Sequence, residues 1–178
     1  MSDYKPGQFS GAKSAALPGG PRNPFMNELP IGTYVGQVLS MEGGQTRNRV
    51  DKFKSVYKVV DRIVEAGEEK GSFPREVDRL ELASGNYYLS SIKAEILAAM
   101  GGKIDILDEN DEPTGETRDI KADDIGEEVM VEAVTNGIFD GALVLIKVWE
   151  QKAKDSGNIY RNARTYPLPD DLREQYSA

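Results

Sequence analysis

The sequence predicts a mainly β fold: a small, partly open β-barrel with one α-helix between its third and fourth strands. Short segments rich in β-branched and aromatic residues recur between turn residues, and one segment alone has the spacing of an amphipathic helix. With 178 residues, the chain is long enough for one domain with a hydrophobic core. We expect a flexible arm over residues 1–30, the barrel over 31–169 and a short, mildly acidic tail over 170–178.

Residues 1–30 repeat Gly and Pro and hold few aliphatic residues. Such a composition buries too little apolar surface to form a core of its own, which predicts a flexible arm. Within this arm Phe9, Phe25 and Met26 are isolated apolar residues. They are suited to dock on the body or on a neighbouring subunit.

Three strands are predicted next, over 31–41, 52–65 and 76–83. Gly36 interrupts the first, which is typical of a β-bulge or a bend. In the second, side chains alternate between two faces, so its basic residues at even positions share one face opposite a largely apolar one. The basic residues are Lys52, Lys54, Lys58 and Arg62, and the polar loop before them carries Arg47 and Arg49.

The helix is predicted to begin at Asn86, because apolar residues recur at spacings of three and four from Tyr88 to Met100. Its polar residues, expected opposite the apolar face, are Ser90, Ser91, Lys93 and Glu95. An acidic insert follows at 103–126. It lacks the EF-hand spacing, since Pro113 and Asp119 stand where Gly and a bidentate Glu are required, so we expect a charged surface loop. Residues 127–135 are predicted as the fourth strand, with Val129, Val131 and Ala133 on one face.

The stretch 141–166 is predicted as a long β-hairpin with Ser156 and Gly157 as its loop. One face is then aliphatic and carries Val144, Ile146 and Val148. The other carries the cross-strand pairs Lys147 with Tyr166, Trp149 with Arg164, Gln151 with Asn162, and Ala153 with Tyr160. An alternative is that Trp149 and Tyr166 are ordinary core residues, with the faces reversed or the register shifted by one residue.

Composition excludes several functions. The chain has neither Cys nor His, which removes disulfides, thiolate and imidazole catalysis and typical zinc sites. No nucleophile motif or phosphate loop is present, so we expect no catalytic residues, no metal site and no cofactor. No segment resembles a signal peptide or approaches the roughly 20 apolar residues of a membrane span. We expect a cytoplasmic protein without a membrane partner, in the host cytoplasm if it is viral.

The net charge of -8 argues at first against a nucleic-acid partner, but the charge is unevenly distributed. Residues 45–62 hold six basic against two acidic residues, and residues 147–164 hold five against two. Residues 105–128 hold eleven acidic against two basic residues. The chain is therefore polarised, with two basic segments on either side of an acidic one.

Three strands, a helix and further strands, with a basic loop after the first strand, is the element order of the OB-fold. From 29 to 169 the chain resembles phage-encoded OB-fold proteins that bind single-stranded DNA. The resemblance is carried by GTYVGQV, FKSVYKVVDRIV, YYLSSIKAEILAAMGG, IGEEVMVEAV and YRNARTYPLP. It implies a non-catalytic protein that coats single strands during replication or recombination. The DNA-contacting positions that the resemblance implies in this sequence are Lys52, Lys54 and Lys58 on the second strand, and Trp149, Tyr160, Arg161, Arg164 and Tyr166 on the hairpin.

Aromatic side chains beside cations suit a single-stranded nucleic acid, since bases stack on the rings and cations neutralise the phosphates. We therefore expect sequence-tolerant binding of single-stranded DNA, or of RNA. Replication or recombination proteins are the expected protein partners, and the chain is expected to form a homo-oligomer. The alternative is a protein-interaction or virion-associated structural module built on a small β-barrel. The candidate binding residues are Arg47, Arg49, Lys52, Lys54, Lys58, Arg62, Lys147, Trp149, Tyr160, Arg161, Arg164 and Tyr166.

Overall fold

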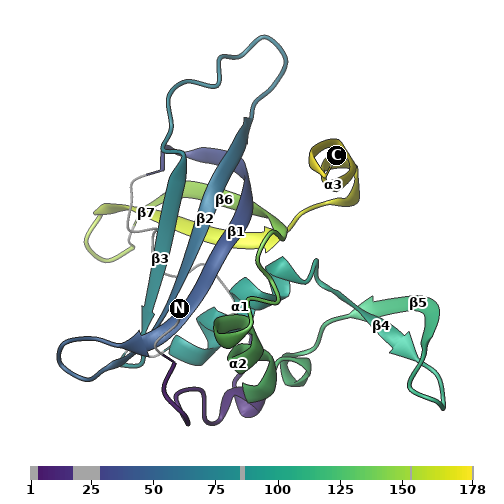
Figure 1. Ribbon diagram of the computed structural model, residues 1–178. Helices are drawn as coiled ribbons and strands as arrows, with labels where there is room; N and C mark the ends of the chain where they lie inside the picture. The colour runs from purple at the N-terminus through teal and green to yellow at the C-terminus, as the bar shows by residue number, and fades with distance from the viewer. Residues whose placement is uncertain (1–3, 18–28, 85–86, 153, 178) are drawn as a thin grey trace.

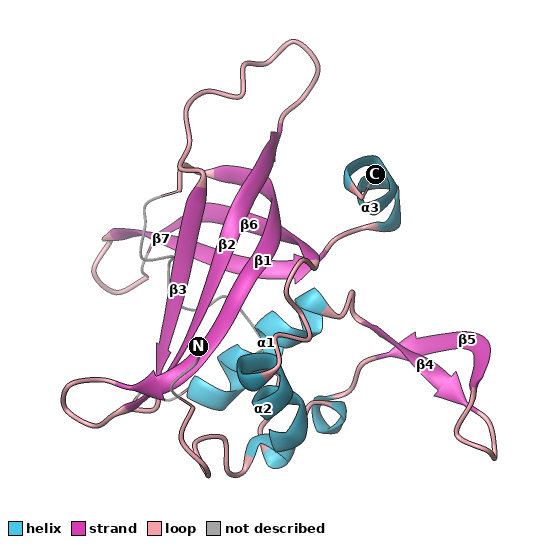
Figure 2. Ribbon diagram, in the orientation of Figure 1, coloured by secondary structure: helices cyan, strands magenta, loops and turns pink. Residues whose placement is uncertain are grey.

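The structure is a computed structural model that describes residues 4–17, 29–84, 87–152 and 154–177, and for Tyr160 the backbone alone. The fold is mainly β, as predicted, and its centre is a five-stranded antiparallel sheet (Figures 1 and 2). The strand order is β3-β2-β1-β6-β7. The strands are β1 (Gly32–Gln45), β2 (Asp51–Ile63), β3 (Glu76–Leu82), β6 (Leu143–Lys152) and β7 (Ile159–Pro167).

The sheet has two edges, β3 and β7, and no backbone ladder joins them among the described residues, so the predicted barrel is not closed. One side-chain hydrogen bond does link the edges. The guanidinium of Arg79 on β3 donates to the carbonyl oxygen of Ala163 on β7 over 3.2 Å. Helix α1 (Tyr88–Ala99) contacts both edge strands. The edges therefore face each other across the interior, with α1 beside the gap.

Residues 127–135 were predicted as a strand, and this prediction is wrong: they form helix α2 (Glu127–Thr135). The helix buries Met130, Ala133 and Val134, which have the three-and-four spacing of a helical face. Glu127 and Glu128 lie in its first turn, where carboxylates favour the positive end of the helix dipole. The β-branched valines suggested a strand, but the helical spacing of the buried residues decides the structure.

The acidic insert forms a hairpin of its own, β4 (Lys103–Leu107) and β5 (Pro113–Asp119), apart from the main sheet (Figure 1). At its turn the carboxylate of Asp108 accepts hydrogen bonds from the backbone N–H groups of Asn110 and Glu112. Most of its residues are exposed, as expected for a charged surface segment. The single-turn helix η2 (Ala122–Asp124) then leads into α2.

Residues 4–17 pack on the body, so this part of the amino-terminal segment is not the flexible arm that we predicted, although the expectation that Phe9 could dock on the body is confirmed. They include the single-turn helix η1 (Ala12–Ser14). The Phe9 side chain is fully buried, with its ring centroid 6.3 Å from that of Phe53 on β2. The ammonium group of the buried Lys93 on α1 donates to the carbonyl oxygens of Lys13, Ala15 and Ala122. Phe25 and Met26 lie outside the described residues.

The carboxyl-terminal tail is also part of the fold, although we predicted that the folded part ends at residue 169. Helix α3 (Asp170–Tyr176) lies on the sheet face opposite α1 and α2. Its Leu172 and Tyr176 pack over a small apolar cluster formed by Val35, Leu143, Leu145 and Leu168. The Tyr176 hydroxyl donates to the Asp61 carboxylate over 2.5 Å, and this hydrogen bond raises the pKa of Tyr176 to about 12.

The main core lies between the inner face of the sheet and helices α1 and α2. It is built from Phe53, Tyr57, Val77, Ile92, Ile96, Met130, Val144 and Ile146, among others. Ser91, Lys93 and Glu95, expected on the solvent side of α1, are all buried. None of the described helices is long and apolar enough to cross a membrane.

Candidate nucleic-acid surface

The sheet face that points away from α1 and α2, here called the outer face, carries the predicted hairpin residues. The observed register pairs Lys147 with Arg164 and Trp149 with Asn162, two residues away from the predicted pairing. The predicted two-residue loop is wrong as well, because β6 ends at Lys152 and β7 begins only at Ile159. A two-residue type I′ turn needs two consecutive residues with positive φ, and of Ser156 and Gly157 only the glycine has one.

A shift of two residues leaves every side chain on its predicted face. Val144, Ile146 and Val148 are accordingly buried in the core. Lys147, Trp149, Arg164 and Tyr166 lie together on the outer face, and we call these four residues the aromatic–cation cluster. Thr33 on β1 lies directly opposite Lys147, so the outer face continues from β6 onto β1.

A shallow pocket of about 370 Å³ lies beside the aromatic–cation cluster. It is lined by Lys147, Trp149 and Tyr166 of the cluster, by Val148, and by Gly32 and Thr33 of β1. The Lys147 ammonium lies 5.3 Å from the Tyr166 ring centroid, and the Arg164 guanidinium lies 5.1 Å from it. Both distances are in the range of cation–π attraction. Tyr166 thus holds two cations in place beside the half-buried Trp149.

The two cations of the cluster have no acidic partner among the described residues. Lys147 and Arg164 form no ion pair there, and the buried Nε of Arg164 makes no hydrogen bond in this part of the chain. Their charge is therefore available to an anionic ligand.

The basic face of β2 is different, because acidic residues on the neighbouring strands offset its charge. Lys54 forms an ion pair with Asp78 on β3 over 3.4 Å and lies opposite Glu42 on β1. Lys58 lies opposite Glu76 on β3. The alternation within β2 alone could not reveal these acidic neighbours. Glu76 and Asp78, at even positions of the predicted third strand, were the sequence signal that carboxylates would lie near the lysines. Lys52, opposite Leu82, is the lysine of this strand without a carboxylate directly across.

Arg62 was predicted on the same face as the β2 lysines, and the structure places it on the other. The register shifts between Val35 and Gly36, leaving Val60 unpaired in a bulge as the glycine suggested, and this extra residue reverses the alternation beyond it. The Arg62 guanidinium lies 5.4 Å from the Tyr34 ring centroid and donates to the carbonyl oxygen of Ile31 over 2.6 Å. Arg62 therefore has a structural role.

Arg161, Arg47 and Arg49 also lie apart from the aromatic–cation cluster. Arg161 points to the opposite face of β7, where it donates to the carbonyl oxygen of Leu29 over 2.8 Å. Arg47 and Arg49 are exposed in the loop between β1 and β2, at the far end of β1 from Trp149. The backbone of Tyr160 pairs with that of Gln151.

Sequence reasoning missed the neighbour of this surface, helix α3. Tyr166 lines the pocket of the cluster and also packs against the apolar cluster under α3. The amphipathic spacing of Leu168, Leu172 and Tyr176 was the available signal, but it is short.

The described residues contain no group of three or more carboxylates that could hold a metal ion. Comparison of the chain with protein-family models and with curated protein sequences finds no match.

Proposed function

We propose that this chain binds single-stranded nucleic acid, in the first place DNA, without catalysis and with little sequence preference. The carrying observation is the aromatic–cation cluster, where a half-buried Trp149 lies beside two cations that no described carboxylate neutralises. A base has a face for stacking there, and a phosphate has two positive partners.

The roles within the cluster are distinct. The Tyr166 ring already has Lys147 and Arg164 over it, so its part is to hold these cations. Trp149 is then the stacking residue. One stacked base contributes roughly 1–3 kcal/mol, and each neutralised phosphate releases counterions.

The fold supports the same proposal. Strand β1 pairs with both β2 and β6, and the edge strands β3 and β7 face each other beside α1. This strand order supports an open OB-fold barrel, a fold whose members bind oligonucleotides. We propose an OB-fold variant to which α2, α3 and the acidic hairpin β4–β5 have been added, acting in phage DNA replication or recombination as the sequence resemblance implies.

Tryptophan fluorescence tests the proposal directly, since the chain has a single Trp. Titration with a dT oligonucleotide of about 12 nucleotides, within the roughly 4–16 that one OB-fold covers, is expected to quench the emission at low salt. Added salt is expected to reverse the quenching. Trp149→Ala, followed by fluorescence anisotropy of a labelled oligonucleotide, is expected to weaken binding about 5- to 150-fold, the equivalent of roughly 1–3 kcal/mol.

Two lysines provide a matched control. Lys147→Ala is expected to lower the slope of log affinity against log salt by about 0.7, as for one phosphate contact on a single strand. Lys54→Ala is expected to change it much less, because Lys54 is already paired with Asp78. Equal slopes for the two variants, or unchanged affinity in a folded Trp149→Ala protein, would refute the assignment of the cluster.

A further inference from the structure

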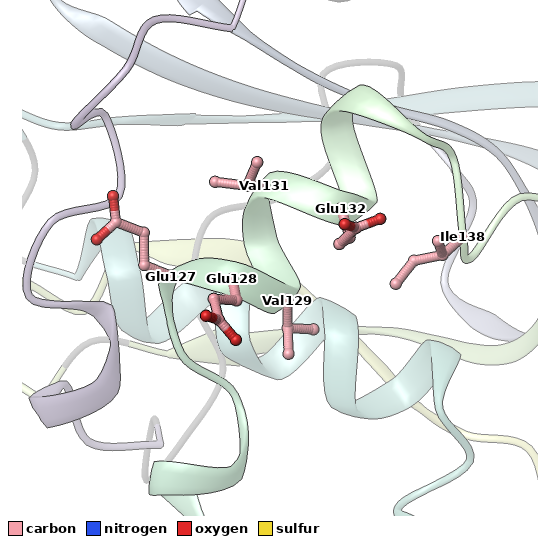
Figure 3. Close-up of a pocket in the computed structure, with 6 residues that line it drawn as sticks. All are labelled: Glu127, Glu128, Val129, Val131, Glu132 and Ile138. Atoms are coloured by element: carbon pink, nitrogen blue, oxygen red, sulfur yellow. The ribbon is translucent and has the colours of Figure 1, made fainter.

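A second surface, distant from the aromatic–cation cluster, has a different chemistry. A shallow pocket of about 690 Å³ lies along α2 and is lined by Val129, Val131 and Ile138 with three glutamates, Glu127, Glu128 and Glu132 (Figure 3). Ile138, on the edge of this pocket, is 51% exposed. Among the residues that the structure describes, no basic one lines this pocket. Its occupant should therefore be an aliphatic side chain flanked by cations.

The chain itself presents such a group at the tip of the β6–β7 hairpin. Ile159 is 64% exposed, the largest exposure among the large hydrophobic residues described. It pairs with Lys152, and the exposed Lys154 lies in the adjoining loop. Two lysines against the one exposed carboxylate of Asp155 leave the tip net positive. An aliphatic side chain on a positive tip complements an aliphatic floor with a carboxylate rim in charge and in apolar character.

The tip and the pocket belong to different parts of one molecule. In Figure 1 the β6–β7 loop is at the left edge of the sheet, whereas α2 lies near the bottom centre. A contact between the tip and the pocket would therefore have to join two copies. Because the two contacting surfaces differ, each added copy leaves a free tip and a free pocket, and the assembly stays open unless its rotation closes a ring.

We propose that copies of this chain associate head to tail, with Ile159 and its flanking lysines inserted into the α2 pocket of the next copy. The contact does not use the aromatic–cation cluster, which remains free on every copy. Because it is a contact between two proteins, this association can be tested independently of nucleic-acid binding.

Sedimentation velocity of the full chain without nucleic acid tests this inference. From about 10 to 500 μM at low salt, the weight-average mass is expected to rise above the 19.6 kDa of one copy. Added salt should weaken the association, because the contact is partly ionic. Ile159→Asp is expected to weaken it at least tenfold while leaving the affinity for a dT oligonucleotide of about 12 nucleotides, which occupies one OB-fold-sized site, unchanged. A wild-type protein that stays monomeric throughout overturns the proposal.

Charge reversal provides a sharper test. One variant carries Glu128→Lys with Glu132→Lys, and the other carries Lys152→Glu with Lys154→Glu. Each alone should be monomeric, since its tip and its pocket carry the same sign. An equimolar mixture should associate again, because each variant then offers the sign that the other needs. Glu116→Lys, an exposed reversal on the acidic hairpin, is the matched control and should leave association intact. Failure of the mixture to associate rules out this contact.

Discussion

Arg79→Met is expected to reduce the free energy of unfolding by about 3–5 kcal/mol at neutral pH, the typical cost of breaking a buried ion pair from one side. Arg79 is 4% exposed, and its guanidinium lies between the buried carboxylates of Glu81 and Glu95. Its Nε is 3.4 Å from Glu81, and its Nη1 is 4.0 Å from Glu95. The substitution leaves two buried carboxylates without this cation, and it also removes the hydrogen bond to Ala163.

The loss is expected to depend on pH. Burial raises the pKa of Glu95, while Arg79 and the hydroxyls of Ser55 and Tyr57 lower it, and the net shift is upward. A carboxyl group whose pKa is raised on folding contributes stability that is present below its unfolded value, near 4.5, and that is lost as pH rises through the folded value. Without Arg79 the pKa of Glu95 rises further, so the variant should lose more stability at pH 8 than at pH 5.5.

Urea unfolding at pH 5.5 and pH 8 measures both effects. The matched control is Arg161→Met, which also removes a hydrogen bond from an arginine to a backbone carbonyl but leaves no buried carboxylate behind. It should cost about 1 kcal/mol at either pH. Adding Glu95→Gln to Arg79→Met should recover part of the loss at pH 8, because one of the uncompensated charges is gone. An Arg79→Met protein as stable as the control contradicts the assigned role.

The strands of the main sheet could be predicted from the sequence because β-branched and aromatic residues recur in them between turn residues, and β2 and β3 also have the alternation of a half-buried strand. The faces of β6 and β7 also followed from alternation, since an error of two residues in register does not change the side on which Trp149 lies. The position of Arg62 did not follow, because one unpaired residue at Val60 reverses the alternation.

Tertiary contacts decide the remaining errors. Lys93 and Glu95 have the positions of solvent-facing residues in an amphipathic helix. Yet the Lys93 ammonium donates to backbone carbonyls of two distant segments, and the Glu95 carboxylate accepts hydrogen bonds from hydroxyls of β2. The valines of α2 favoured a strand by propensity, which packing overrides. The charge of the β2 face likewise depends on Asp78 and Glu42 across the strands. None of these partners is close in sequence.

The amino-terminal segment is the clearest example, and it gives the second large prediction. Phe9→Ala is expected to reduce the free energy of unfolding by about 3–5 kcal/mol, the usual cost of removing a buried phenylalanine side chain. The Phe9 ring is fully buried against Phe53, and the Tyr4 ring stacks on it with a centroid distance of 5.7 Å. A residue in a flexible arm would cost almost nothing to replace.

Urea unfolding gives the size of the effect, and trypsin reports its location. Lys13 lies within η1, and its carbonyl oxygen accepts a hydrogen bond from the Lys93 ammonium, so cleavage after Lys13 should be slow in the native protein. Phe9→Ala should accelerate this cleavage under conditions where the sheet stays folded, because the segment opens locally before the whole domain unfolds. Ser10→Ala, at the exposed neighbouring position, should change neither stability nor cleavage. Equal cleavage rates for Phe9→Ala and Ser10→Ala would show that Phe9 does not hold the segment in place.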